Sequence, residues 1–197
     1  MRKAEKTRQY ILEKTAPLFN KKGYEGTSLS DITNATGLTK GSIYGNFSSK
    51  DEVALAVYEY STGLLIDQLD RAIHEQSTAP EKLIAMTAFY RNHWPGVFRN
   101  GGCPMLNAAI EADDGPPFLQ ICVQDSFANW EKKIINILET GIKKGEIRQG
   151  IVAADYASTI ITQIEGGIML SKITENARHL TLALDRLVKM IDSELKP

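Results

Sequence analysis

The sequence has few of the residues and segments that mark disulfide-rich or membrane-spanning proteins. It contains two cysteines, Cys103 and Cys122, which are too few for a disulfide framework and are not spaced as a CxxC pair. No apolar run approaches the ~20 residues needed to cross a bilayer, and polar side chains interrupt the stretch 156–170. The basic residues 1–6 are not followed by an apolar stretch, so we expect no signal peptide. A reducing cytoplasm is therefore the expected location.

The sequence also lacks the motifs of the common enzyme and metal-binding classes. Three histidines, His74, His93 and His179, occur without an HExxH or ExxH arrangement, so zinc-peptidase and di-iron sites find no support. GxSxG, Walker and GxGxxG motifs are absent as well. Glu175 and His179 lie four residues apart at an expected helix start, where surface exposure or capping explains them. We expect no catalytic site, no metal and no cofactor.

Charge is unevenly distributed, although the formal net charge is only −1. Residues 1–50 hold nine basic and four acidic side chains, a net charge of +5. The rest of the chain holds fourteen basic and twenty acidic side chains, a net charge of −6. A basic N-terminal segment on an acidic remainder favours contact of that segment with a polyanion, although a solvated surface gives the same pattern.

Helical patterning runs through almost the whole chain. Apolar side chains recur at the helical spacing in residues 11–19, and Lys21, Lys22 and Gly23 supply the signals that end a helix. Similar stretches, separated by Gly, Pro, Ser and Thr, predict about nine helices. No segment has sustained alternation of period two, and no internal repeat is found. The expected fold class is therefore all-α.

Residues 29–47 have the pattern of two short helices joined by a tight turn, a helix-turn-helix. The first is expected over about 29–35 and the second from Thr39 to about Phe47. Gly37 suits the turn because glycine adopts a left-handed backbone conformation at little cost. Three apolar side chains are placed to pack the two helices together, those of Ile32, Leu38 and Ile43.

The second of these helices presents a small, polar and lightly basic surface. Its outward-facing residues are Thr39, Lys40, Ser42, Tyr44, Gly45 and Asn46. Such a surface fits a major groove about 12 Å wide, where hydroxyls and a lysine can donate to phosphates and Ser42 and Asn46 can reach base edges. Thr27, at a helix start, can add a phosphate contact through exposed backbone N–H groups. A small three-helix bundle with an accidental polar face would show the same pattern.

These residues resemble the N-terminal signature of the TetR family of transcriptional repressors. The resemblance spans about residues 6–55 and is carried by TSLSDI (27–32), TGLTKGSIY (36–44), Asn46-Phe47 and KDE (50–52). It implies an all-helical repressor with a three-helix DNA-binding domain over residues 1–48. A ligand-binding and dimerisation domain over residues 49–197 is implied with it.

The family pattern, applied to this sequence, implies specific DNA contacts. It implies phosphate contacts from Thr27, Thr39, Tyr44 and Lys50, and groove or base contacts from Lys40, Gly41 and Ser42. The expected partner is double-stranded DNA with a palindromic operator. Three positions depart from the common pattern: Gly45 where an aromatic residue is frequent, Asn46 where histidine is frequent, and Thr33 where alanine is usual. Gly45 has no ring or hydroxyl, which leaves that contact with the DNA backbone in question.

The last two expected helices carry apolar stripes suited to pairing of two chains around a two-fold axis. The family dimerises through its last two helices, so the resemblance implies a homodimer with a four-helix interface. The residues expected there are Tyr156, Ile160, Ile164, Gly167, Ile168, Leu180, Leu184, Leu187 and Ile191. Gly166 and Gly167 would allow close backbone approach. The alternative is that both stripes are buried within their own chain.

The middle of the chain is rich in aromatic and apolar residues with a few polar atoms, as a ligand cavity between helices requires. Candidates for contact with a small-molecule effector are Met86, Phe89, Tyr90, His93, Trp94, Met105, Asn107, Glu111, Phe127 and Trp130. Core packing explains most of them equally well. Residues 101–111 (GGCPMLNAAIE) resemble one branch of the family. Within them, Asn107 and Glu111 lie on one helix face. They would form the polar end of a pocket or bond to another helix. Cys103, in the same segment, is expected to be an inert thiol rather than a redox switch.

The function expected from these patterns is that of a ligand-responsive DNA-binding regulator, a repressor released from its operator by a small molecule. One alternative is a helical small-molecule-binding protein or enzyme with a degenerate DNA-binding segment, for which Gly45 is the main support. A further alternative is an adaptor that dimerises without any ligand.

Overall fold

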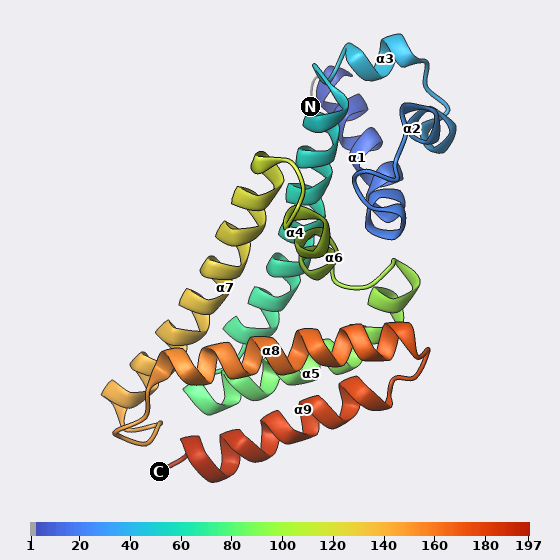
Figure 1. The fold of residues 1–197 in the computed structure, drawn as a ribbon. Helices are drawn as coiled ribbons and strands as arrows, with labels where there is room; N and C mark the ends of the chain where they lie inside the picture. The colour runs from blue at the N-terminus through green and yellow to red at the C-terminus, as the bar shows by residue number, and fades with distance from the viewer. Residues whose placement is uncertain (1–2) are drawn as a thin grey trace. The chain divides into compact units, whose positions relative to one another are not determined.

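The computed structural model describes residues 3–197, which form helices and no β-strand (Figure 1). Nine α-helices occur in these residues: α1 (Lys3–Lys22), α2 (Leu29–Thr36), α3 (Lys40–Tyr44), α4 (Lys50–His74), α5 (Ala79–Arg99), α6 (Pro104–Ala112), α7 (Pro117–Lys144), α8 (Ala153–Ile173) and α9 (Arg178–Met190). A π-helical turn, Ile191–Leu195, continues α9. The predicted all-α fold is confirmed. None of the described helices combines the length and apolar character of a membrane span.

The helices fall into two compact units. The first comprises the N-terminal residues up to Leu65 together with Asn100–Gln124, and the second comprises Ile66–Arg99 together with Asp125–Pro197. α4 and α7 therefore contribute residues to both units. This division differs from the boundary expected after residue 48, because α6 contacts α1 within the first unit. The assignment of DNA binding to residues 1–48 and of ligand binding and dimerisation to residues 49–197 stays a prediction.

Local signals start and end the short helices of the first unit. α1 ends just before Gly23, which has a φ of 78°. α2 begins after Ser28, whose Oγ accepts a hydrogen bond from Asp31 N at 3.1 Å, while the Asp31 carboxylate accepts one from Ser28 N at 2.9 Å. These two bonds form a capping box. Gly37 follows α2 with a φ of 68°, the left-handed conformation expected for the turn.

One isoleucine from each of the first three helices forms the centre of the first unit. Ile11 of α1, Ile32 of α2 and Ile43 of α3 have no exposed surface, and Phe47 is also buried. The packing role predicted for Ile32 and Ile43 is confirmed. Burial of these side chains fixes the orientation of α3, because its opposite side must then face outward.

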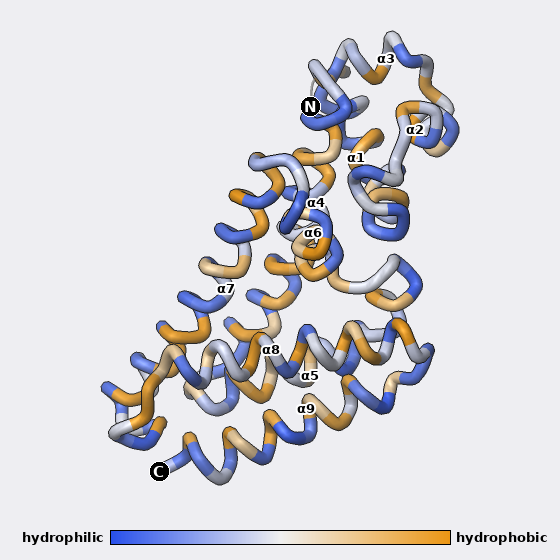
Figure 2. Tube along the Cα trace, in the orientation of Figure 1, coloured by the Kyte–Doolittle hydropathy of each residue, from blue (hydrophilic) through white to orange (hydrophobic). Residues whose placement is uncertain are grey.

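The second unit is built on the pairing of α8 with α9, with α5 packed against α9. Apolar residues recur along α8 and α9 between polar ones (Figure 2). The two helices approach closely at Gly167, where a Cβ would lie 3.0 Å from Leu180 Cα. Ser171 Oγ accepts a hydrogen bond from Leu180 N at 2.8 Å and so satisfies one N–H group at the start of α9.

The apolar stripes expected at a dimer interface are instead the core of this unit. At most 2% of the surface is exposed at Ile160, Ile164, Ile168, Leu180, Leu184, Leu187 and Ile191. Tyr156 bonds within the chain through its hydroxyl, which donates to Glu194 Oε2 at 3.0 Å. The close approach at Gly167 is also to the same chain. A side chain without exposed surface has none to bury against a second chain, so the interface role expected for these seven side chains is corrected. Tyr156 is half-buried, and its place in a dimer interface stays a prediction.

Two helices end at other places than expected. α5 continues through Pro95 to Arg99 rather than stopping at Pro95. Proline lacks an N–H group and its ring crowds the carbonyl four residues earlier, yet the helix continues past it here. α3 ends at Tyr44 rather than near Phe47, because Asn46 N donates to Ile43 O at 3.0 Å and tightens the last turn.

Candidate nucleic-acid interface

α3 is a five-residue helix whose start is fixed by its own cap. Thr39 Oγ1 accepts a hydrogen bond from Ser42 N at 3.1 Å and lies 3.1 Å from Ser42 Oγ. Ile43 anchors the buried side of the helix. The residues exposed on the other side are Thr39, Lys40, Gly41, Ser42, Tyr44 and Gly45. The structure therefore brings six of the nine predicted DNA-binding residues together on one exposed surface.

Lys40 and Tyr44 are the largest side chains of this surface. Lys40 Nζ lies 5.8 Å from the centre of the Tyr44 ring, and 40% of the surface of Tyr44 is exposed. Lys40 forms no ion pair within residues 3–197. An exposed ammonium without an ion pair, close to the ring of an exposed tyrosine, is chemically suited to contact a phosphate backbone.

Arg8 of α1 supports the end of α3 from the inside of the first unit. Its Nη1 donates to Asn46 O at 2.8 Å and to Glu52 Oε1 at 3.0 Å. Its guanidinium lies 4.1 Å from the centre of the Phe47 ring. Sequence reasoning did not identify this role, because the two contact partners lie 38 and 44 residues away and no local signal connects them.

Thr27 and Lys50, both predicted to contact phosphates, are engaged inside the first unit. Thr27 has no exposed surface, and its Oγ1 donates to Gly23 O at 2.6 Å. Lys50 Nζ donates to Tyr24 O at 3.2 Å and lies 4.6 Å from the centre of the Tyr24 ring. A buried hydroxyl cannot reach DNA in this conformation, and the Lys50 ammonium already has a carbonyl and a ring as partners. The Thr27 hydroxyl is therefore not available to DNA, whereas the phosphate contacts expected from the backbone N–H groups at Thr27 and from Lys50 stay predictions.

Asn46 and Gly45, two of the three departures from the family pattern, differ in their environment. Asn46 is half-buried, and its Nδ2 donates back to Ser42 O at 2.9 Å. Gly45 is exposed with a φ of −75°, so its backbone conformation is open to any residue. A Cβ there would lie 3.2 Å from Gly41 O, a close contact but not an overlap. Glycine at position 45 is therefore not required by the fold of α3.

Two carboxylates near this surface are held ionised by their hydrogen bonds. The hydrogen bond from Lys22, followed by those from Ser28, lowers the pKa of Asp31 well below its usual range. Backbone and hydroxyl hydrogen bonds from Ser48, together with one from Arg8, lower the pKa of Glu52 to about 2. Both carboxylates are paired with cations, Lys22 at 2.6 Å and Arg8 at 3.0 Å, respectively. Their negative charge is therefore locally compensated, which limits repulsion of a polyanion.

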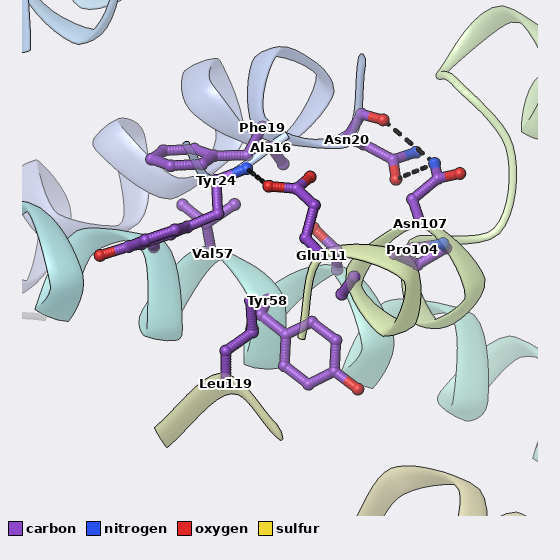
Figure 3. A pocket seen from close by; sticks show the side chains of 13 residues that line it. Ala16, Phe19, Asn20, Tyr24, Val57, Tyr58, Pro104, Asn107, Glu111 and Leu119 are labelled. Carbon is purple, nitrogen blue, oxygen red and sulfur yellow. Dashed lines mark hydrogen bonds between the residues drawn. The ribbon is translucent and has the colours of Figure 1, made fainter. Parts of the chain in front are cut away.

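α6 is joined to the end of α1 by a set of hydrogen bonds (Figure 3). Asn107 Nδ2 lies 3.0 Å from Asn20 O and 2.8 Å from Asn20 Oδ1, and donates to these oxygens. Glu111 Oε2 accepts hydrogen bonds from Tyr24 N at 2.7 Å and from Glu25 N at 3.1 Å. Of the two uses expected for these residues, Asn107 bonds to another helix and Glu111 to the turn after α1, and both side chains also line a small pocket. The partners lie 86 or 87 residues apart in the sequence, so no local pattern predicted these hydrogen bonds.

Tyr24 lies at the centre of this junction. Its hydroxyl donates to Asp51 at the start of α4. Its ring packs edge-on against Phe118 of α7, with centroids 5.7 Å apart. Burial, reinforced by the hydrogen bond to Asp51, raises the pKa of Tyr24 above its usual range. Residues of α4, α6 and α7 thus meet at Tyr24.

The predicted effector-contact residues divide between the two units. Met105, Asn107 and Glu111 belong to the first unit, and the other seven belong to the second. In the second unit, neighbouring rings form a chain of contacts through His93, Phe89, Tyr90, Trp130 and Phe127. Met86, Phe89, Tyr90 and Trp130 are buried, Trp94 and Phe127 are half-buried, and His93 is exposed. Trp130 Nε1 is buried without a hydrogen-bond partner in the described residues.

Other potential reactive groups do not cluster. Within residues 3–197, no group of three or more His, Cys, Asp and Glu side chains is placed to hold a metal ion. Cys103 is 2% exposed and Cys122 is half-buried, and neither forms a disulfide. Burial of the Cys103 thiol agrees with the inert role expected for it.

Known protein families match both parts of the chain. Residues 79–187 match the family described as "Tetracyclin repressor-like, C-terminal domain", and residues 11–57 match "Bacterial regulatory proteins, tetR family". An uncharacterized HTH-type transcriptional regulator of Lactococcus lactis is 31% identical over 185 residues, which cover 92% of this chain and 91% of the relative. The HTH-type transcriptional repressor DhaR of a Mycobacterium species is 24% identical over 193 residues, which cover 96% and 92%.

Solved structures show the same fold over the full length. The crystal structure of a TetR-family transcriptional regulator from Cytophaga hutchinsonii has a TM-score of 0.93 and 36% identity, covering 99% of this chain and 98% of that one. A TetR transcriptional regulator from Chloroflexus aurantiacus has a TM-score of 0.92 and 36% identity, covering 100% and 99%. With its exposed α3 and these matches along both units, the chain belongs to the TetR family of bacterial DNA-binding transcriptional regulators.

Proposed function

We propose that this regulator is a repressor, which binds a palindromic operator as a homodimer and leaves it when a small molecule binds. The observation that carries the proposal is the exposed side of α3, where Lys40, Ser42 and Tyr44 are presented over the buried Ile43. In a homodimer, two copies of α3 about 34 Å apart would enter successive major grooves. Thr39, Gly41, Gly45 and Asn46 would border the contact.

The dimer would form through the outer sides of α8 and α9 rather than through their buried stripes. Met169, Leu170 and Ile173 of α8 have 45%, 43% and 77% of their surface exposed, and Leu182 of α9 has 49% exposed. The three α8 residues recur at spacings of one, three and four, so they share one side of the helix. Clustered exposed apolar side chains are typical of a surface that another protein covers. A second copy of the chain is the proposed partner.

The contacting aromatic rings of the second unit, those of Phe89, Tyr90, His93, Phe127 and Trp130, form the proposed effector-binding region. Buried N–H donors almost always have a partner, yet Trp130 Nε1 has none in the described residues. An effector oxygen at this nitrogen would supply the missing acceptor, while the rings of Phe89, Tyr90 and Phe127 would bury its apolar part. Met86, His93 and Trp94 belong to the same region of the sequence and complete the proposed set.

Coupling between effector and operator would run through helices that take part in both units. α4 contributes residues to each unit, so a change at its C-terminal part can alter the position of its N-terminal part. A coupling free energy of about 1–3 kcal/mol is enough to lower operator affinity 5- to 150-fold.

The proposal is tested by titrating DNA that adjoins the protein's own gene and following fluorescence anisotropy. We expect a specific complex whose affinity falls steeply as the salt concentration rises. Substitution of both Lys40→Ala and Tyr44→Ala should weaken it, whereas Lys132→Ala on α7 should not. If no specific, salt-sensitive complex forms at modest salt, DNA regulation by this chain is refuted. Operator binding that is unchanged in the double variant would locate recognition elsewhere than on α3.

We further propose that the protein acts in the cytoplasm and has no catalytic activity. Membership of a family of transcriptional regulators supports both statements. We also propose that the chain belongs to a branch of the family with a GCPMLNAAIE-like segment, a proposal supported by the sequence of residues 101–111.

A further inference from the structure

The first unit contains a small cavity that the proposed function does not use (Figure 3). Its volume is about 50 Å³, and thirteen residues from α1, the adjoining Tyr24, α4, α6 and α7 line it. A buried water needs roughly 10–15 Å³ on the same measure. The cavity therefore has space for a ligand of a few non-hydrogen atoms and is too small for a drug-sized effector.

The electrostatics of the cavity are set by one group. Glu111 is the only charged residue among the thirteen that line it. No lysine or arginine within the described chain forms an ion pair with Glu111. Glu111 Oε2 accepts from two backbone N–H groups, whereas no hydrogen bond is formed by Oε1 within residues 3–197. Glu111 Oε1 therefore has no hydrogen-bond donor in the described chain, and it lies against Gly23.

The remaining lining is mainly apolar and aromatic. Phe19 and Tyr24 lie on the side of α1, while Val57, Tyr58 and Leu119 lie across the cavity (Figure 3). The ammonium of Lys50, which stacks on the Tyr24 ring, is already bonded to Tyr24 O at 3.2 Å. Aromatic faces attract cations, and apolar walls favour alkyl groups.

We propose that this cavity binds a small organic cation, a primary alkylammonium of about five non-hydrogen atoms. The ammonium group would donate to Glu111 Oε1, and the alkyl part would contact Val57 and Leu119. A charge-assisted hydrogen bond is about twice as strong as a neutral one, so the site prefers a cation to a neutral molecule of equal shape. An anion is disfavoured because the only charge in the lining is negative.

Isobutylammonium is a suitable probe, and isobutanol is its neutral counterpart of nearly equal shape. We expect saturable binding of isobutylammonium to the full-length protein, followed by NMR shifts of the methyl groups of Val57, Leu119 and Ala108. For a ligand of this size the dissociation constant should be on the order of millimolar. Isobutanol should bind roughly tenfold more weakly.

Two variants test the negative charge of Glu111 and the free volume of the cavity separately. Glu111→Gln keeps an oxygen for Tyr24 N and removes the charge, so affinity for isobutylammonium should fall roughly tenfold while isobutanol affinity is unchanged. Ala108→Met fills the cavity and should abolish binding of both probes. Glu139→Gln, at an exposed position of α7, is the matched control and should bind as the unmodified protein does.

The proposal is overturned if isobutylammonium causes no saturable shifts at Val57 and Leu119. Equal affinity for isobutanol, or unchanged affinity of Glu111→Gln, would also overturn it, because the carboxylate would then play no part. Since these measurements involve no DNA, they are independent of whether the chain is a repressor.

Discussion

Glu111 and Gly23 fit together only because Gly23 has no side chain. Gly23 follows α1 with a φ of 78°, and a Cβ at this position would overlap Glu111 Oε1. The same carboxylate accepts hydrogen bonds from the next two backbone N–H groups, those of Tyr24 and Glu25. A side chain of α6 thus accepts the backbone N–H groups of the turn that follows α1.

Replacing Gly23→Ala should therefore destabilise the protein for two separable reasons. Left-handed backbone costs an alanine about 1–2 kcal/mol. Displacement of Glu111 removes its hydrogen bonds and adds about 1–2 kcal/mol. The free energy of unfolding in urea measures the sum.

Gly145→Ala is the matched control, because Gly145 has a φ of 73° and open space around its Cα. Gly145→Ala should lower the free energy of unfolding only by the cost of the left-handed backbone conformation. In a Glu111→Ala background, Gly23→Ala should cost no more than Gly145→Ala does. Equal costs of the two glycine substitutions in the unmodified protein would contradict the packing described for Glu111.

Loss of the Glu111 carboxylate itself should lower stability. Glu111→Ala leaves the N–H groups of Tyr24 and Glu25 without their acceptor, which should cost about 1–2 kcal/mol. Glu111→Gln retains an oxygen and should cost less than half as much. Urea unfolding of the two variants is the measurement, and an equal loss in both would mean that the charge, not the hydrogen bonds, stabilises the junction.

Lys40 and Lys50 should differ in their effect on DNA binding. Lys40 is exposed and without an ion pair in the described chain, whereas Lys50 is bonded to Tyr24 O. In each protomer that contacts the operator, Lys40→Ala should remove one phosphate contact. The slope of log affinity against log salt concentration should then fall by about 1 per protomer. Lys50→Ala should leave the slope unchanged and lower thermal stability instead.

Fluorescence anisotropy over a series of salt concentrations gives these slopes. Lys132→Ala should alter neither slope nor stability. A reduced slope for Lys50→Ala would show that its ammonium leaves Tyr24 and contacts phosphate when DNA is bound.

Glu52 should make stability depend on pH in the acid range. Its pKa is lowered to about 2 in the folded protein, so the unfolded chain binds its proton first as the pH falls. The stabilisation is complete above the usual glutamate pKa of about 4.3 and is lost as the pH falls from there toward about 2. Glu52→Gln should remove this part of the pH dependence.

The free energy of unfolding, measured at several pH values in this range, tests the prediction. Ser48→Ala removes the hydroxyl donor but keeps the backbone donor of Ser48, so it should have an intermediate effect. A Glu52→Gln profile parallel to that of the unmodified protein would refute it.

A charge on the outer side of α8 should prevent dimerisation. Ile173 is 77% exposed in the single chain, and burying a lysine there against a second chain without a partner is unfavourable. Ile173→Lys should shift the mass measured by light scattering after gel filtration toward the monomer, with unchanged helix content. Ala128→Lys, at an exposed position of α7, should keep the mass of the unmodified protein. A dimer that persists in Ile173→Lys would place the interface on another surface.

The amino-acid sequence by itself determined the helices, the caps and the exposed side of α3. Ser28 with Asp31, Gly37 after α2 and the isoleucines of α2 and α3 act over a few residues, so their pattern is visible along the chain. The family resemblance of residues 6–55 rests on this local pattern too.

Only the tertiary structure decided which partner each polar or apolar side chain has. It placed Lys50 on Tyr24, Arg8 under the end of α3 and Glu111 at the end of α1, across 26 to 87 residues. It also buried the stripes of α8 and α9 against each other instead of leaving them for a second chain. An apolar stripe shows that a helix side will be covered, but hydrophobic burial is not directional, so the sequence does not say by what.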